Sequence, residues 1–245
     1  MKPLSASELL SIWERGQERS PGVRALLLLE STASGDQSPA KLSVGRRDAL
    51  LLSLRETLFG SRFVGLAACP NCGQLSELTF ESSEIRSSAD NAQPETLRVR
   101  AGGYEARFRL PNTEDLLAVA AFARCDTSSA AESLLTRCLI QARRKGQPVS
   151  IESTRDLPPS LLAAIGEKME QADPQANVQL ILNCYACDHN WPANFDIVSY
   201  LWSEIDDWAR RILSEVYTLA SAFGWREADI LGMSARRRRL YMEMV

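Results

Sequence analysis

The chain has 245 residues, of which 45% are hydrophobic and 24% charged, with a formal net charge of −3. This is the profile of an ordinary globular protein that can bury a large core. The charge balance argues against a global field that recruits nucleic acid or anionic membrane. No run approaches roughly 18 consecutive apolar residues, and the start of the chain lacks the features of a signal peptide, so we expect a cytoplasmic protein.

Residues 1–60 predict an N-terminal helical region. Ser5 and Glu8 form a capping-box pattern at the start of the first helix. Gly16 and then Pro21-Gly22 interrupt the apolar periodicity, and a further helix is expected at about residues 45–59.

Two Cys-x-x-Cys pairs carry the strongest chemical signal of the sequence. Two cysteines at this spacing can face one ion from a single tight turn, and four thiolates from two such turns make a closed tetrahedral zinc site. Such a site has no open position for a substrate, so the predicted Zn²⁺ is structural. The four predicted ligands are Cys69, Cys72, Cys184 and Cys187.

Strands are expected on both sides of each pair, so residues 61–80 and 178–194 together predict a split zinc ribbon. Residues 81–177 then form a long insert. Its clearest part is a β-hairpin at 96–110 with one apolar and one basic face, and that basic face is expected to be solvated, with its arginines bridging to nearby acids. Helices are expected in the insert at about 113–124, 128–144 and 158–171.

Residues 195–245 predict a C-terminal helical arm. A long helix at about 197–223 has an apolar stripe at steps of three and four residues. The basic and apolar end of the chain is either docked on its own domain or available to a partner, and both alternatives stay open. The predicted partner-binding residues are Trp202, Trp208, Trp225, Arg237, Arg238 and Tyr241.

The remaining cysteines and the single histidine are expected to have minor roles. Cys125 and Cys138 lie inside helical patterns and are interpreted as buried core thiols. His189 is an alternative metal ligand close to the second pair, although four thiolates are sufficient. Nothing else resembles a catalytic set, so we expect no enzyme; a thiol-redox pair is a distant alternative, because such pairs usually start a helix.

Segments at both ends of the chain and around both cysteine pairs resemble a known family. The segments that carry the likeness include Leu10-Ser-Ile-Trp-Glu-Arg-Gly-Gln17, Val44-Gly-Arg-Arg-Asp-Ala-Leu-Leu51, Phe59-Gly60, Cys69-Pro-Asn-Cys72, Phe195-Asp-Ile197, Leu201-Trp202, Phe223-Gly-Trp225 and Arg237-Arg238. They look like baseplate proteins related to the hub-assembly chaperone of T-even phages, found in contractile phages and extracellular contractile injection systems. The likeness covers about half of the chain and is weak in residues 81–180.

The resemblance implies a non-enzymatic structural or assembly factor for the baseplate hub of a contractile, phage-tail-like particle. Its partners would be hub, spike or tape-measure proteins, and the protein itself could be incorporated in the particle. The expected fold class is α+β and mainly helical, with the split four-cysteine zinc ribbon and its insert flanked by N- and C-terminal helices. The alternative is a zinc-ribbon nucleic-acid-binding regulator that uses the basic hairpin and Arg236–Arg239 as contacts.

Overall fold

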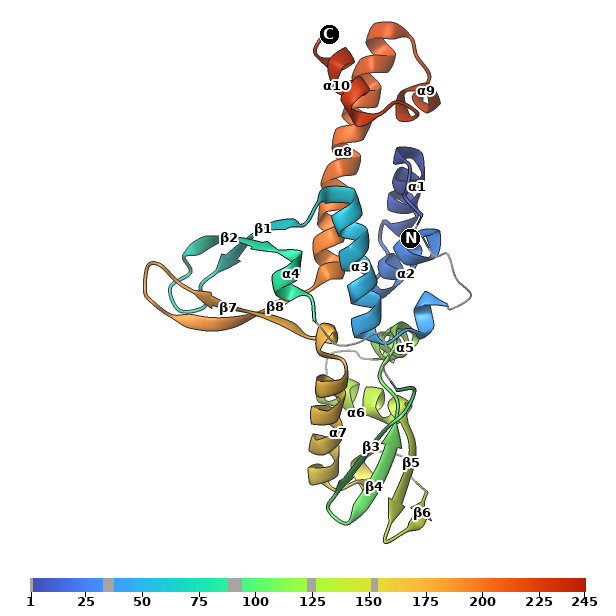
Figure 1. The fold of residues 1–245 in the computed structure, drawn as a ribbon, viewed down its shortest axis with the longest axis vertical. Coiled ribbons are helices and arrows are strands. Elements are labelled where there is room, and N and C mark those ends of the chain that lie inside the picture. Colours follow the sequence, from blue (N-terminus) through green and yellow to red (C-terminus); the bar gives the residue numbers. More distant parts are fainter. Residues whose placement is uncertain (1, 33–37, 88–93, 123–126, 151–153) are drawn as a thin grey trace. The chain divides into compact units, whose positions relative to one another are not determined.

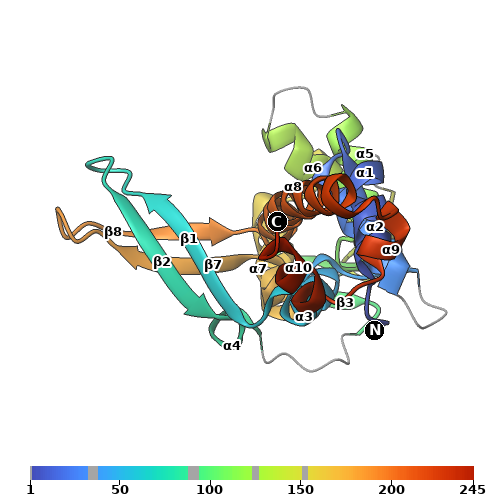
Figure 2. The same cartoon turned by 90° about the horizontal axis from the view of Figure 1, so that it is seen from above.

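The computed structural model describes residues 2–32, 38–87, 94–122, 127–150 and 154–245. The chain divides into two compact units, which are drawn together in Figures 1 and 2. Unit one comprises Met1–Asp36 and Ile197–Val245, and unit two comprises Gln37–Asp196. Within the described ranges, no helix has the length and apolar character needed to cross a membrane. The fold is mixed, with helices and small antiparallel sheets.

Unit one is helical in its described residues. The predicted capping box is confirmed, since Ser5 accepts from the Glu8 backbone N–H and the Glu8 side chain accepts from the Ser5 backbone. The predicted long helix is also confirmed and has an amphipathic stripe with six buried side chains: Leu201, Ile205, Ala209, Ile212, Val216 and Leu219. The helices are α1 (Ala6–Gly16), α2 (Pro21–Thr32), α8 (Ile197–Phe223), α9 (Glu227–Leu231) and α10 (Ala235–Met242).

A close approach between α1 and α8 depends on a glycine. A Cβ atom built on Gly16 would lie 2.1 Å from the ring of Trp202, so no larger residue fits without displacing that ring. The guanidinium of Arg24 lies over the same ring, 4.6 Å from its centroid. Trp202 is 6% exposed and thus belongs to the interior of unit one.

The C-terminal helix α10 is docked on its own unit, and the binding of a partner to this end of the chain stays a prediction. Ser234 caps this helix, as its side chain accepts from the Arg237 backbone N–H. Arg238 is buried and donates from Nε to Glu215 at 3.0 Å. The Tyr241 ring packs edge-on against Trp225, with 4.8 Å between the ring centroids.

Unit two contains the remaining elements, and the eight strands among its described residues form three antiparallel sheets: β1-β2, β3-β4-β5-β6 and β7-β8. Its helices are the 3-10 turns η1 (Pro39–Lys41), η2 (Thr154–Asp156) and η3 (Pro174–Ala176), and α3 (Val44–Phe59), α4 (Ser82–Ile85), α5 (Thr113–Phe122), α6 (Thr127–Cys138) and α7 (Pro159–Ala172). Its strands are β1 (Arg62–Ala68), β2 (Leu75–Glu81), β3 (Leu97–Ala101), β4 (Tyr104–Phe108), β5 (Leu139–Arg144), β6 (Gln147–Val149), β7 (Val178–Asn183) and β8 (Asn190–Phe195).

The four-stranded sheet has one apolar face, as the alternation in the predicted hairpin indicated. Gly102 and Gly103 turn the chain between β3 and β4, and both have the positive φ that glycine adopts without strain. Alternate strand residues face a core that includes Phe108 and the α7 side chains Leu161 and Ile165. The opposite face of the sheet is polar.

The prediction of a helix at 128–144 is wrong for the second half of that segment. Helix α6 ends at Cys138, and residues 139–144 form strand β5, in which the buried Ala142 pairs with Ala106 of β4. The Arg-Arg-Lys-Gly run that suggested a helix C-terminus leads into a hairpin turn, where Lys145 has φ 49° and Gly146 φ 83°. Pairing with a strand distant in the sequence overrides a weak local helix preference.

Helix α3 begins in a buried polar cluster. The Gly45 backbone N–H donates to Asp173 Oδ2 at 2.9 Å. Arg47 Nε donates to the buried Asp48 carboxylate at 2.7 Å. Burial raises the pKa of Asp48 to about 6; the charge and hydrogen bond of Arg47 oppose this rise, and Asp196 and Asp173 add to it.

This raised pKa predicts a pH dependence of the free energy of unfolding. The folded state binds the Asp48 proton below about pH 6, whereas the unfolded state binds it only near the ordinary value of 3.8. Stability should therefore fall as the pH rises from 4 through 6, by up to about 3 kcal/mol from this group. Urea unfolding at several pH values should show that the Asp48→Asn variant lacks this fall in the free energy of unfolding. All other titrating groups are common to the variant and the unchanged chain. A profile parallel to that of the unchanged chain would contradict the assignment, and the exposed Glu167→Gln is the control.

Candidate metal centre

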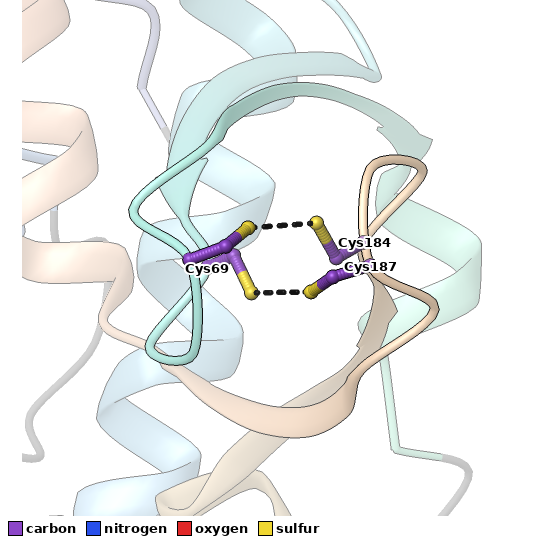
Figure 3. Close-up of side chains that lie close together, drawn as sticks. Cys69, Cys184 and Cys187 are labelled. Carbon is purple, nitrogen blue, oxygen red and sulfur yellow. Dashed lines mark hydrogen bonds between the residues drawn. The ribbon is translucent and has the colours of Figure 1, made fainter.

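The four predicted ligands lie at the tips of two β-hairpins of unit two. The first hairpin is β1-β2 and the second is β7-β8, each closed by a Cys-x-x-Cys turn. Figures 1 and 2 show the two hairpins extending in the same direction, and Figure 3 shows Cys69 facing Cys184 and Cys187 of the other hairpin.

The first turn is a compact knuckle held by its own backbone. The Cys69 backbone N–H donates to the Gln74 carbonyl at 2.9 Å, and the Gly73 backbone N–H donates to the Cys69 carbonyl at 2.9 Å. Gly73 has φ 74°, a left-handed conformation that favours glycine. The Gln74 backbone N–H donates to the sulfur of Cys72.

The second turn repeats this pattern residue for residue. The Cys184 backbone N–H donates to the His189 carbonyl, and the Asp188 backbone N–H donates to the Cys184 carbonyl, both at 2.9 Å. Asp188, at the position equivalent to the glycine, has φ 54°, which Asp tolerates better than most residues. The His189 backbone N–H donates to the sulfur of Cys187. Two turns with different sequences have therefore adopted one geometry.

The sulfur positions fit a metal ion and exclude disulfides. The Sγ atoms of Cys69 and Cys187 are 3.7 Å apart, and those of Cys72 and Cys184 are 3.6 Å apart. All four lie within 4.8 Å of one another. A disulfide requires about 2.05 Å, whereas a tetrahedral site with bonds of about 2.3 Å has sulfur–sulfur edges of about 3.8 Å. The arrangement is compatible with a metal site.

The electrostatics of the cluster also favour a cation. Hydrogen bonds from the Asn71 side chain and the His189 backbone N–H lower the pKa of Cys187 to about 6. The Gln74 backbone N–H lowers the pKa of Cys72, but the neighbouring thiols outweigh it and raise the pKa to about 12. One thiolate thus forms readily and opposes ionisation of the next, a penalty that a bound cation removes.

The two hairpins also meet at their bases. The ring of Phe63 stacks on Phe80 at 5.1 Å, and the ring of Phe195 from the second hairpin packs edge-on against both, at 5.6 and 5.5 Å. Arg55 covers Phe63 with its guanidinium 4.0 Å from the ring centroid. An aromatic cluster therefore joins the bases, and the four sulfurs face one another at the tips.

Between base and tip the hairpins bury few apolar side chains. Leu66 is 72% exposed and Ile181 is 75% exposed. An isolated two-stranded hairpin is marginally stable in water, so the tips need a further connection to stay in place. The four cysteines lie at these tips, and together they would supply this connection by binding one metal ion.

The sequence also singled out one histidine and two further cysteines, and the structure gives a different result for each of them. Among the described residues, the group with metal-ligand spacing consists of the four cysteines and does not include His189. The His189 ring instead stacks on Trp191, with 6.1 Å between the centroids. Cys138 is fully buried, as predicted. Cys125 lies outside the described residues.

The six predicted partner-binding residues all lie in unit one, where most have internal contacts. Trp202 and Arg238 are buried, and Trp208, Trp225 and Tyr241 pack beside the core cluster of α8. Arg237 is exposed and lies over the Tyr241 ring at 5.7 Å. The four consecutive arginines therefore do not form one surface, and the partner-binding role of these six residues stays a prediction.

Further exposed apolar residues of unit one are not among the six predicted partner-binding residues. Tyr217 is 75% exposed, and Leu213 lies one helical turn before it. Leu240, Met244 and Val245 are between 50% and 71% exposed near the end of the chain. The alternation of buried and exposed apolar residues around α8 is the signal that could have found them, because the apolar positions are more numerous than one buried stripe needs.

Comparison with known proteins identifies the family. A family model described as "T4 bacteriophage base plate protein" matches residues 25–200, a segment that contains both cysteine pairs. No curated protein and no solved structure matches the chain. Because the matched segment covers well over half of the 245 residues, the chain belongs to the T4 bacteriophage base plate protein family.

Proposed function

We propose that this protein is a non-enzymatic structural or assembly factor for the baseplate hub of a contractile, phage-tail-like particle. The observation that carries the proposal is the family match over residues 25–200, since the family suggests a structural role in a phage baseplate. Its partners would be other baseplate proteins of the hub, spike or tape-measure classes. It would act through contacts between protein surfaces.

Within this proposal the four cysteines bind one structural Zn²⁺. The support is the pair of equivalent knuckles, sulfur separations of 3.6 and 3.7 Å across the two knuckles, and two hairpins that otherwise meet at their bases. Four thiolates are the ligand set that favours zinc in tetrahedral geometry. The ion would fix the position of the two hairpin tips, and no step of chemistry on a substrate is assigned to it.

The proposed contact surface is made of exposed apolar side chains of unit one, which are Leu213, Tyr217, Phe223, Leu240, Met244 and Val245. Its occupant would be a second baseplate protein, because the family assembles into a multiprotein structure. The contacts of Arg238 with Glu215 and of Tyr241 with Trp225 would hold α10 and the end of the chain in place.

Surface variants test this assignment. Tyr217→Glu together with Leu240→Glu should weaken co-purification with baseplate proteins encoded beside this chain by at least about tenfold, because a charge would have to be desolvated in the interface. Both side chains are at least half exposed, so the melting temperature should be unchanged. Truncation after Gly232 should also abolish binding and leave unit two folded, but it uncovers buried groups and is the less specific variant.

Tyr217→Phe is the matched control, since it keeps the ring and should keep binding. Full binding by the double glutamate variant would overturn the proposed surface. Failure to co-purify any baseplate protein with the unchanged chain would contradict the proposed function itself.

A further inference from the structure

The polar face of the four-stranded sheet in unit two concentrates positive charge. Of the five arginines in the four strands, Arg98, Arg100, Arg107 and Arg143 alternate onto this face together with Glu105, the one acidic residue of these strands. The net charge of the whole chain is negative, so this face is a local feature. It was expected to be a solvated surface whose arginines bridge to nearby acids.

Among the arginines of this face, only some form the expected ion pairs with nearby acidic residues. Arg100 pairs with Glu105, with 3.2 Å between the charged atoms. Arg98 and Arg107 are directly opposite each other on β3 and β4, where like charges destabilise a strand pair. Arg143 lies on β5 directly opposite Glu105. No carboxylate among the described residues pairs with Arg98, Arg107 or Arg143.

These arginines surround a hollow of about 100 Å³, lined by Arg98, Glu105, Arg107, Gln141 and Arg143. The Nε atom of Arg107 is shielded from solvent and has no hydrogen-bond partner within the described structure. A buried donor without an acceptor destabilises the fold. A carboxylate can accept two parallel hydrogen bonds from one guanidinium, so an arginine that has no acidic partner and lines a hollow is suited to bind one.

We propose that this hollow is a binding site for a carboxylate from an acidic segment of a partner protein. Arg107 would bind the carboxylate with two parallel hydrogen bonds, and Arg98 and Arg143 would add charge from the two sides. Gln141, directly opposite Arg107, would donate its side-chain amide. The site lies in unit two, so it is distinct from the apolar surface of unit one and does not depend on it.

An acidic protein segment fits this site better than nucleic acid. A nucleic acid presents a row of phosphates and needs an extended basic track. Here the unpaired arginines converge on one small hollow of about 100 Å³ and do not line an extended track. Membership of a family of baseplate proteins also points to partners that are proteins.

Fluorescence anisotropy with a labelled peptide of about eight alternating Glu and Asp residues tests the site in the full chain. Binding is expected at about 50 mM NaCl and should weaken with added salt. Arg107→Met should reduce the affinity at least about tenfold. Arg144→Met is the matched control, because it removes one arginine of the same sheet that does not line the hollow, and should reduce the affinity less than about threefold.

A second variant distinguishes binding from folding. Gln141→Glu places a carboxylate directly opposite Arg107, so it should block the peptide and raise the melting temperature. Arg107→Met should likewise leave the melting temperature unchanged or raised, because it removes an unsatisfied donor and a like-charge pair.

Three results would overturn the proposal. The first is equal weakening by Arg107→Met and Arg144→Met, which would indicate the general field of the sheet. The second is no binding of the peptide at any salt concentration. The third is tight binding of a single-stranded oligonucleotide with no binding of the peptide. Loss of the C-terminal contact surface would change none of these measurements, so the two proposals fail independently.

Discussion

Cys69→Ser is expected to lower the melting temperature by at least about 10 °C and to abolish retention of one zinc per chain after dialysis. Cys69 is 2% exposed, and its sulfur lies 3.7 Å from that of Cys187 in the other knuckle. Metal binding by four thiolates is coupled to folding, and a bound ion would close a loop of more than one hundred residues between the two pairs. In a chain of this size a loss of a few kcal/mol shifts the melting temperature by about 10 °C.

Cys138→Ser is the matched control for the loss of a buried thiol. Cys138 is fully buried but lies outside the four-cysteine group. This variant should lose some stability, because a hydroxyl replaces a thiol in an apolar site, yet it should retain one zinc per chain and remain sensitive to a chelator. Elemental analysis with thermal unfolding in the presence and absence of chelator measures both quantities. Unchanged melting of the Cys69→Ser chain would show that the hairpin tips need no metal.

Phe63→Ala is expected to lower the free energy of unfolding of unit two by about 3–5 kcal/mol, the usual range for a fully buried aromatic side chain. Phe63 is 0% exposed and contacts Phe80, Phe195 and Arg55. Its removal leaves a cavity where the two hairpins meet. The zinc affinity should fall as well, because the hairpin bases then no longer hold the two knuckles at a fixed separation.

Leu66→Ala on the same strand is the control for this substitution. Leu66 is 72% exposed, so its truncation should change the free energy of unfolding by no more than about 0.5 kcal/mol and leave the zinc affinity unchanged. Denaturant unfolding and a competitive zinc titration provide the two measurements. Equal effects of the two substitutions would show that the aromatic cluster does not join the hairpins.

Elements whose signals are local in the sequence were predicted well. The stripe of α8 gave its bounds, because the apolar period of a long helix is repeated many times within one segment. The capping box of Ser5 with Glu8 depends on residues only three positions apart, and it is present. The same holds for each knuckle, since Cys-x-x-Cys with a residue that tolerates positive φ just after it specifies the turn.

The candidate site was predicted as a set of four residues but not as a geometry. The sequence named the four cysteines, while their meeting depends on two hairpins whose bases are joined through Phe63, Phe80 and Phe195. Nothing in the spacing of these aromatic residues shows that they share a cluster. Likewise, the buried state of Arg238 follows from Glu215, which lies 23 residues earlier on another helix.

The sequence by itself therefore determined the helices with clear periodicity, the turns with specific residues, and the four cysteines of the candidate metal centre. The tertiary structure alone decided that residues 139–144 form a strand, because the free energy of pairing with β4 outweighs a weak local helix preference. It alone placed Arg98, Arg107 and Arg143 around one hollow, since this needs the register of three strands. It also placed the two knuckles tip to tip, because contacts between distant segments depend on the whole packed chain and leave no pattern in either segment.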